Sequence, residues 1–315
     1  MSEVPVIDLA SADGDATLAR IEAACREWGF FQVRGHGLPR ELGARVMTEM
    51  QRFFAEPTAT KREIERTAAN AWGFYDRELT KNRRDWKEIF DVGREIDDGA
   101  LAGNRPQWPS RLPGFRETVL EFFAACETVG VRLLAAIERI LETPTGELVR
   151  EFGARQTSFL RLNYYPRCAD PAPSDAPFHP TTGHLGIHHH TDSGALTVLL
   201  QDDVPGLQVL HDGRWHLVEP RPDALVINIG DVVQVWSNDR FPAPVHRVLA
   251  NSARERYSAP FFLNPAPETV YAPLAAVSRE GARYRPICWG EFRAARAAGD
   301  YADVGEEIQI SRYRI

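Results

Sequence analysis

The stretch ALTVLLQDDVPGLQVLHDGRWHLVEPRPDALVINIG, residues 195–230, contains several short runs of apolar or alternating residues. The runs ALTVLLQ, GLQVLH, RWHLVEP and ALVINIG are separated by Asp, Gly and Pro. Short runs rich in Val, Ile and aromatic residues between such turn formers predict β-strands. Many short strands with tight turns are typical of a sandwich, a barrel or a jelly roll. This stretch therefore predicts a β core.

The strand pattern extends to both sides of this stretch and changes further out. TSFLRLNYYP, VHRVLA and YSAPFFLN are further predicted strands. Before residue 155, apolar residues recur mainly at helical spacing, as across Phe115–Leu141, with one strand predicted in FFQVRGHGL. Residues 71–113 show no regular period. We expect an α+β protein, mainly β in its core, that folds as a single unit over 1–315. Its expected parts are a helical N-terminal region at 1–155 that packs on the core, a β catalytic core at 156–286 and a helical tail at 287–315.

Composition and charge narrow the function classes. The chain has 315 residues, 43% hydrophobic and 26% charged, with a formal net charge of -7, as in ordinary globular proteins. No block of Lys and Arg favours nucleic acid or an anionic membrane as a partner. Neither a signal peptide nor a membrane helix is predicted. The four cysteines lie far apart and form no CxxC, which is typical of free thiols in a reducing compartment. We expect a cytoplasmic protein that acts on a small molecule.

Three of the nine histidines are consecutive, in GIHHHTDSG. Side chains two apart on a strand point to the same side, so His190 and Asp192 face one way. Iron sites that activate O2 commonly use two His and one carboxylate and leave the other positions open. His246 begins the predicted strand HRVLA and can supply the third ligand from a neighbouring strand. The pair His188 and His190 has the same spacing as His190 and Asp192, but it would leave Asp192 without a role.

Several blocks in one order resemble the iron(II)/2-oxoglutarate-dependent oxygenases, in the branch that contains isopenicillin N synthase. A lone HxD would be weak support, whereas these blocks cover nearly the whole chain. They are VPVIDLA, WGFFQVRGHGL, RLNYYP, HTDSGALTVLLQDDVPGLQV, NIGDVVQVWSNDRFPAPVHRV and RERYSAPFFLNP. The resemblance implies a double-stranded β-helix, or jelly roll, flanked by N-terminal and C-terminal helices.

The resemblance also implies the cofactors and the residues that hold them. It implies Fe(II), with 2-oxoglutarate and O2 as co-substrates, and it assigns the metal to His190, Asp192 and His246. It further implies that the distal carboxylate of 2-oxoglutarate is held by Arg256 and Ser258, chemistry that suits a guanidinium and a hydroxyl. Positions that contact the co-substrate in the family are matched by Asn163 and Tyr165.

The implied reaction is oxidation of a C–H bond of a small molecule, most simply hydroxylation, with release of succinate and CO2. Three alternatives remain open. One is an oxidase similar to isopenicillin N synthase that uses no 2-oxoglutarate and performs cyclisation or desaturation. The others are a metal-dependent binding protein without turnover and a hydrolytic zinc enzyme. Release of succinate separates the first alternative from the main prediction.

Substrate contacts are expected in the segment WGFYDRELTKNRRDWKEIFDVG, residues 72–93, which also resembles the family. The candidates in this segment are Phe74, Tyr75, Glu88 and Phe90. The alternative interpretation places Phe74 and Phe90 in the core and Glu88 in an ion pair. The Pro-rich stretch Arg167–Gly183 is a second candidate for covering the pocket, because binding residues are often carried on loops.

Overall fold

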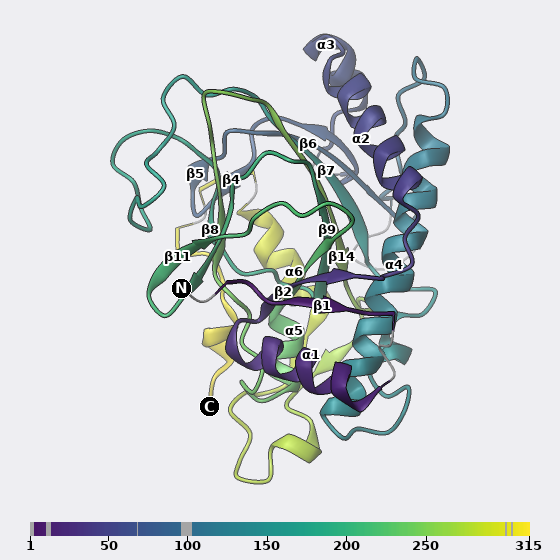
Figure 1. Cartoon of the computed structure of the whole chain (residues 1–315), viewed down its shortest axis with the longest axis vertical. Helices are drawn as coiled ribbons and strands as arrows, with labels where there is room; N and C mark the ends of the chain where they lie inside the picture. The colour runs from purple at the N-terminus through teal and green to yellow at the C-terminus, as the bar shows by residue number, and fades with distance from the viewer. Residues whose placement is uncertain (1–2, 11–13, 68, 96–102, 300, 304) are drawn as a thin grey trace.

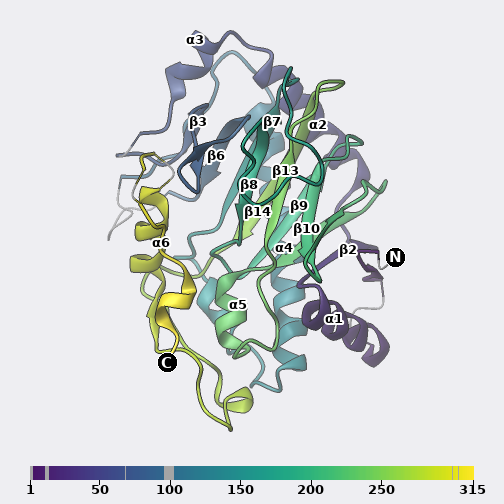
Figure 2. The same ribbon diagram turned by 90° about the vertical axis from the view of Figure 1, so that its left-hand side faces the viewer.

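The chain forms two main β-sheets with helices outside them (Figures 1 and 2). A cavity lies between the two sheets. The computed structural model describes residues 3–10, 14–67, 69–95, 103–299, 301–303 and 305–315. The cavity is lined from both sheets, for example by Leu199 of the larger sheet and Val248 of the smaller one.

The larger sheet has eight strands, in the order β1-β2-β12-β9-β14-β7-β6-β3. All neighbours in it run antiparallel except β1 and β2, which are parallel. The strands are β1 (Val6–Asp8), β2 (Phe30–Arg34), β12 (Leu225–Ile229), β9 (Leu196–Gln201), β14 (Arg256–Leu263), β7 (Phe159–Tyr165), β6 (Glu88–Gly93) and β3 (Gly73–Tyr75).

The smaller sheet has four antiparallel strands, in the order β11-β10-β13-β8. They are β11 (Arg214–Leu217), β10 (Leu207–His211), β13 (His246–Leu249) and β8 (Leu185–His190). Two small ribbons complete the described strands: β4 (Leu79–Thr80) with β5 (Arg83–Arg84), and β15 (Val270–Tyr271) with β16 (Ile287–Cys288).

Helix α4 (Phe115–Ile140) is the longest helix and lies against β9 and β14 of the larger sheet (Figure 1). Its apolar stripe, which includes Val119, Phe122 and Leu133, is buried, and fully burying a side chain of this kind contributes about 1.5–3 kcal/mol. The other helices are α1 (Asp15–Glu27), α2 (Arg40–Phe54), α3 (Thr58–Lys61), α5 (Asp231–Trp236) and α6 (Trp289–Ala298), with 3-10 turns at Arg62–Ile64, Val149–Phe152, Ala275–Val277 and Ile310–Tyr313.

The N-terminal region is less purely helical than expected. Besides α1, α2 and α4, it supplies β1, β2, β3 and β6 to the larger sheet. Strands β3 and β6 fall in the stretch 71–113, where the sequence shows no regular period. Within the described part of the chain, every helix is too short or too polar to cross a membrane.

Candidate active site

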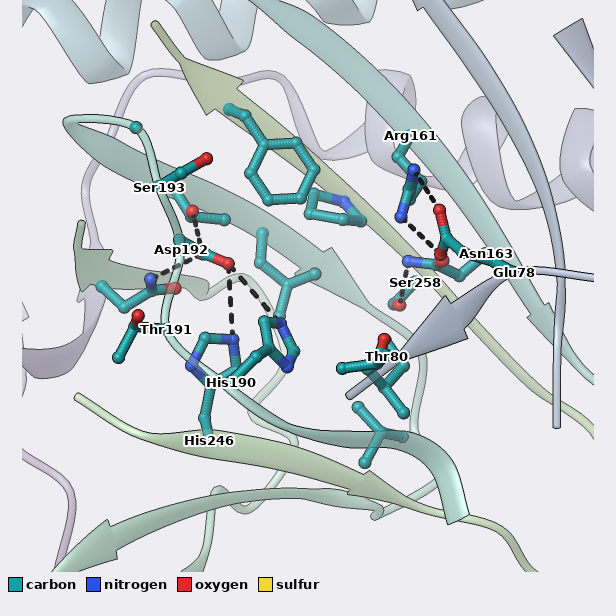
Figure 3. A pocket seen from close by; sticks show the side chains of 18 of the residues that line it. Glu78, Thr80, Arg161, Asn163, His190, Thr191, Asp192, Ser193, His246 and Ser258 are labelled. Carbon is teal, nitrogen blue, oxygen red and sulfur yellow. Dashed lines mark hydrogen bonds and ion pairs between the residues drawn. The ribbon is translucent and has the colours of Figure 1, made fainter. Parts of the chain in front are cut away.

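Strand pairing brings the predicted metal ligands together. His190 ends β8 and His246 begins β13, and the two residues lie opposite each other in the register of these strands. Asp192 follows two residues after His190. One ligand atom from each of the three residues lies within 4.8 Å of the other two (Figure 3). Among the described residues, this is the group of His, Cys, Asp or Glu side chains arranged to hold a metal ion.

Backbone carbonyls orient both imidazoles. The Nδ1 atom of His190 lies 2.8 Å from the carbonyl oxygen of His188, and that of His246 lies 3.1 Å from the carbonyl oxygen of Pro244. A proton on each Nδ1 directs the lone pair of Nε2 toward Asp192 Oδ1, which is 3.6 Å from one ring and 3.7 Å from the other. Burial, and next the neighbouring His246, lowers the pKa of His190 to about 3, so this imidazole is neutral and able to bind a metal.

The Asp192 carboxylate is oriented by two buried donors on neighbouring strands. Its Oδ2 accepts hydrogen bonds from Asn228 Nδ2, at 2.8 Å, and from the Thr197 hydroxyl. Although burial opposes ionisation, His246, His190 and these two donors hold the pKa of Asp192 below its ordinary value. Oδ1 is left facing the imidazoles. Two imidazoles and one carboxylate on one side of a cavity are a donor set that fits Fe(II).

Replacing Asn228 with alanine is expected to weaken Fe(II) binding about 10- to 100-fold, the usual cost of losing one outer-sphere partner of a ligand. The Asn228 side chain is 2% exposed and holds the ligand oxygen directly, so the loss frees the carboxylate to rotate. Anaerobic Fe(II) titration measures the effect. Asn238→Ala is a control, because Asn238 bonds only backbone groups remote from the metal ligands. Equal weakening by both substitutions would contradict the prediction.

The predicted co-substrate residues lie on two adjacent strands of the larger sheet. Arg256 and Ser258 on β14 pair with Tyr165 and Asn163 on β7, respectively. All four line the same cavity as the metal ligands. The Asn163 amide donates to the Ser258 hydroxyl at 3.4 Å, as Figure 3 shows. The four side chains therefore form a polar patch on one wall of the cavity.

Arg256 is placed to receive an anion. It is 1% exposed and its guanidinium carbon lies 5.0 Å from the centre of the Tyr165 ring. Nε donates to the carbonyl oxygen of Val204 at 3.2 Å, and Nη2 donates to Gln201 Oε1 at 2.9 Å. Nη1 is buried and has no hydrogen-bond partner among the described residues. A buried charged donor without a partner is costly unless a ligand supplies the acceptor.

The other histidines of the HHH motif lie apart from the ligand group. Asp85 Oδ1 lies 2.9 Å from Nδ1 of His188 and also accepts the His188 backbone N–H at 3.0 Å. The His189 ring meets the rings of Phe178 and His179 at centroid distances of 4.8 and 4.9 Å. The ligand group is therefore formed with Asp192 rather than with His188.

The four expected substrate contacts do not line the cavity. Phe74 and Phe90 are fully buried and face each other across β3 and β6, where both pack against Phe53. Tyr75 stacks with arginine side chains, and Glu88 pairs with Lys61 at 2.5 Å. Phe74, Glu88 and Phe90 point to the face of the sheet away from the cavity, whereas Tyr75 shares the face of Ile89 and contacts Arg66 beside the cavity. The cavity lining therefore gives no support to these four residues as substrate contacts. The stretch Arg167–Gly183 also contributes no residue to the cavity lining.

Other residues of the 72–93 segment do reach the cavity. Glu78, Leu79, Thr80 and Lys87 line it, together with Arg161 of β7. The signal for Arg161 was available in the sequence, since period-2 alternation puts it on the same face of the strand as Asn163. No comparable period marked Glu78 or Lys87, which immediately precede β4 and β6.

Known proteins share these features. Residues 156–265 match the model of the 2OG-Fe(II) oxygenase superfamily, and residues 4–113 match the model described as non-haem dioxygenase in morphine synthesis N-terminal. Flavanone 3-dioxygenase 2 of Oryza sativa subsp. japonica is 35% identical over 300 residues, which cover 92% of this chain and 82% of the relative. Gibberellin 2-beta-dioxygenase 8 of Arabidopsis thaliana is 32% identical over 319 residues, covering 99% and 87% of the two chains.

Among solved structures, JOX2 in complex with 2OG, Fe and JA superposes with a TM-score of 0.81 at 30% identity, over 99% of this chain and 88% of that chain. The dioxygenase for auxin oxidation of rice gives a TM-score of 0.75 at 28% identity, over 99% and 100% of the two chains. The similarity thus extends over the described helices as well as the two sheets.

Proposed function

This chain belongs to the 2OG-Fe(II) oxygenase superfamily, and from that premise we propose that it is a dioxygenase dependent on Fe(II) and 2-oxoglutarate. The proposed reaction oxidises a C–H bond of a small molecule, most simply by hydroxylation, and releases succinate and CO2. The observation that carries the proposal is one cavity that holds both the His190, Asp192 and His246 group and the unpartnered Nη1 of Arg256.

Each residue has a defined part in this proposal. His190, Asp192 and His246 would hold the iron, which when bound supplies the oxidation chemistry. Asn228 and Thr197 keep the carboxylate oriented. Arg256 would bind the distal carboxylate of 2-oxoglutarate through Nη1 and share Nη2 with Gln201.

The rest of the co-substrate patch would complete that site. The Ser258 hydroxyl would add a donor to the same carboxylate, and Asn163 fixes that hydroxyl through its amide. Tyr165 would support the guanidinium by cation–π contact. In the complexed structure of JOX2 the bound species are 2OG, Fe and JA, so a small-molecule substrate is the natural extension for this chain.

The organisation of the chain and its location follow from the same proposal. The chain would work as a single unit, with the N-terminal and C-terminal helices flanking the β core. The four cysteines are free thiols, which favours a reducing cytoplasmic location.

Anaerobic addition of 2-oxoglutarate to the Fe(II)-loaded protein is expected to produce a weak visible charge-transfer band. Admission of O2 is then expected to yield succinate slowly even without a substrate. Both changes follow if the keto acid binds the metal while its distal carboxylate reaches Arg256. Absorption spectroscopy and succinate assay measure them. Oxygen consumption without succinate would instead support the oxidase that uses no 2-oxoglutarate, and metal binding without oxygen consumption would support a binding protein.

A further inference from the structure

The two strands that carry the co-substrate patch continue past it along the cavity. On β7, the inward side chains beyond Tyr165 and Asn163 are Arg161 and Phe159, and all of them line the cavity. On β14, the last side chain that points into the cavity is that of Phe262, which lies opposite Phe159 in the strand register. The Phe159 and Phe262 rings stack at a centroid distance of 4.6 Å. If the proposed function is correct, this end of the wall is left for the substrate.

A buried group of six charged residues stands beside this wall. The Glu78 carboxylate forms ion pairs with Lys87 at 2.7 Å, with Arg66 at 2.9 Å and with Arg161 at 2.8 Å. Asp91 pairs with Arg66 and Arg161, and Asp85 lies 3.1 Å from Lys87. We call Arg66, Glu78, Asp85, Lys87, Asp91 and Arg161 the ion-pair cluster. Its three cations are balanced by its three carboxylates.

Within the ion-pair cluster, Lys87 both lines the cavity and has one N–H beyond its two carboxylate partners. Its ammonium has three N–H groups, and Glu78 and Asp85 are the two carboxylates beside it. The side chain is 2% exposed and lines the cavity. Although burial opposes the charged form, Glu78 and Asp85 raise the pKa of Lys87 above its ordinary value, so it remains an ammonium.

Hydrogen bonds place the segment that carries Lys87 beside β8, the strand that ends at the metal ligand His190. The preceding residue, Trp86, donates its backbone N–H to the carbonyl oxygen of Leu185 on β8 at 3.0 Å. Asp85 binds His188 of the same strand. The segment 85–87 therefore lies alongside β8, and Lys87 lines the same cavity as His190 and Arg161.

We propose that Lys87 determines substrate specificity by donating its remaining N–H to an uncharged oxygen acceptor of the substrate, a carbonyl of ketone, ester or amide type. The apolar part of the substrate lies against Phe159 and Phe262. An uncharged acceptor is favoured over a carboxylate at Lys87 because the ion-pair cluster is already neutral, so its ammonium has no uncompensated charge to offer a further buried anion.

The other cations of the lining are engaged elsewhere. Arg296 donates to the carbonyl oxygens of Thr191 and Ile308, at 3.0 and 3.2 Å. The Arg293 guanidinium lies 5.8 Å from the centre of the Phe159 ring. Glu307, which also lines the cavity, pairs with Lys81 at 3.2 Å. Capture of a substrate carboxylate by these arginines is the competing outcome of the test.

The test uses three probes with the same phenyl group: acetophenone, benzoate and ethylbenzene. Their binding to the full chain, loaded with Zn(II) and 2-oxoglutarate, is measured by ligand-observed NMR. The wild-type protein is expected to bind acetophenone about 10-fold more tightly than the other two, in keeping with one hydrogen bond from a charged donor. Lys87→Met is expected to remove this preference over ethylbenzene. The double substitution Lys87→Met with Asp85→Asn, which restores charge balance, is expected to remove it equally.

Lys61→Met is the matched control. Lys61 is a buried lysine paired with Glu88 that donates to the carbonyl oxygen of Phe54, and it does not line this cavity. It is expected to keep both the ketone preference and the substrate-independent succinate formation. Tighter binding of benzoate, equal or undetectable binding of all three probes by the wild type, or a ketone preference that survives in the double variant would each overturn the proposal. The proposal would also be overturned if the Lys87 variants bound 2-oxoglutarate more weakly and kept the preference for the ketone. Absence of succinate from the iron-loaded wild type would instead overturn the proposed function. The binding of the three probes to the Zn(II)-loaded protein does not depend on succinate formation, so the two failures can be told apart.

Discussion

Replacing Asp192 with alanine is expected to abolish Fe(II) binding and turnover. Asp192 is the anionic member of the ligand group, and its Oδ1 faces both Nε2 atoms. Without it, only the two imidazoles remain as ligands, and the Asn228 amide and Thr197 hydroxyl lose their acceptor. Loss of an outer-sphere partner already costs about 10- to 100-fold, so loss of the ligand is expected to lower succinate formation by more than about 100-fold.

Two neighbouring histidines give the controls for this prediction. His189→Ala is expected to keep the iron stoichiometry, because its ring contacts Phe178 and His179 and takes no part in the ligand group. His188→Ala is expected to keep it as well. Iron content after anaerobic loading and desalting is the measurement. If Asp192→Ala retained iron while His188→Ala lost it, the assignment of the ligands would be wrong by two residues.

The metal and co-substrate residues could be predicted because they lie on local, regular patterns. Asn163 and Tyr165 are two apart on β7, and Arg256 and Ser258 are two apart on β14, so the alternation of a strand fixes their shared face. The family resemblance supplied their roles. What the sequence does not contain is the pairing of β7 with β14 in a register that puts the two pairs opposite each other.

The substrate end of the cavity was predicted less well, for a physical reason. The ion-pair cluster draws its members from strands, turns and loops between residues 66 and 161, and only tertiary packing brings them together. The aromatic residues of 72–93 suggested a pocket, but Phe74 and Phe90 pack into the helix-facing core with Phe53. In β6, which is buried on both faces, each face mixes apolar and acidic residues, so the sequence period does not tell which face is the pocket.

Replacing Arg256 with alanine is expected to raise the KM for 2-oxoglutarate about 30-fold or more while iron still binds. Truncating one partner of a buried, hydrogen-bonded charge pair costs about 2–5 kcal/mol, and about 1.4 kcal/mol corresponds to a factor of ten. Arg256 is 1% exposed, so water cannot readily replace the guanidinium as a donor to the distal carboxylate. Initial rates of succinate formation at varied 2-oxoglutarate concentration give the KM.

Arg254 provides the matched control two residues away on the same segment. Its guanidinium pairs with Asp203 at 2.7 Å, and both side chains are exposed, so Arg254→Ala is expected to leave the KM nearly unchanged. Arg256→Lys separates charge from shape: it keeps the cation, but an ammonium cannot reproduce the planar arrangement in which Nε binds Val204, Nη2 binds Gln201 and Nη1 faces the cavity. The KM of the lysine variant is therefore expected to lie between those of the wild type and the alanine variant. Equal increases at residues 254 and 256 would mean that the effect comes from the summed positive charge of the segment, and the buried guanidinium would lose its assigned role in binding the co-substrate.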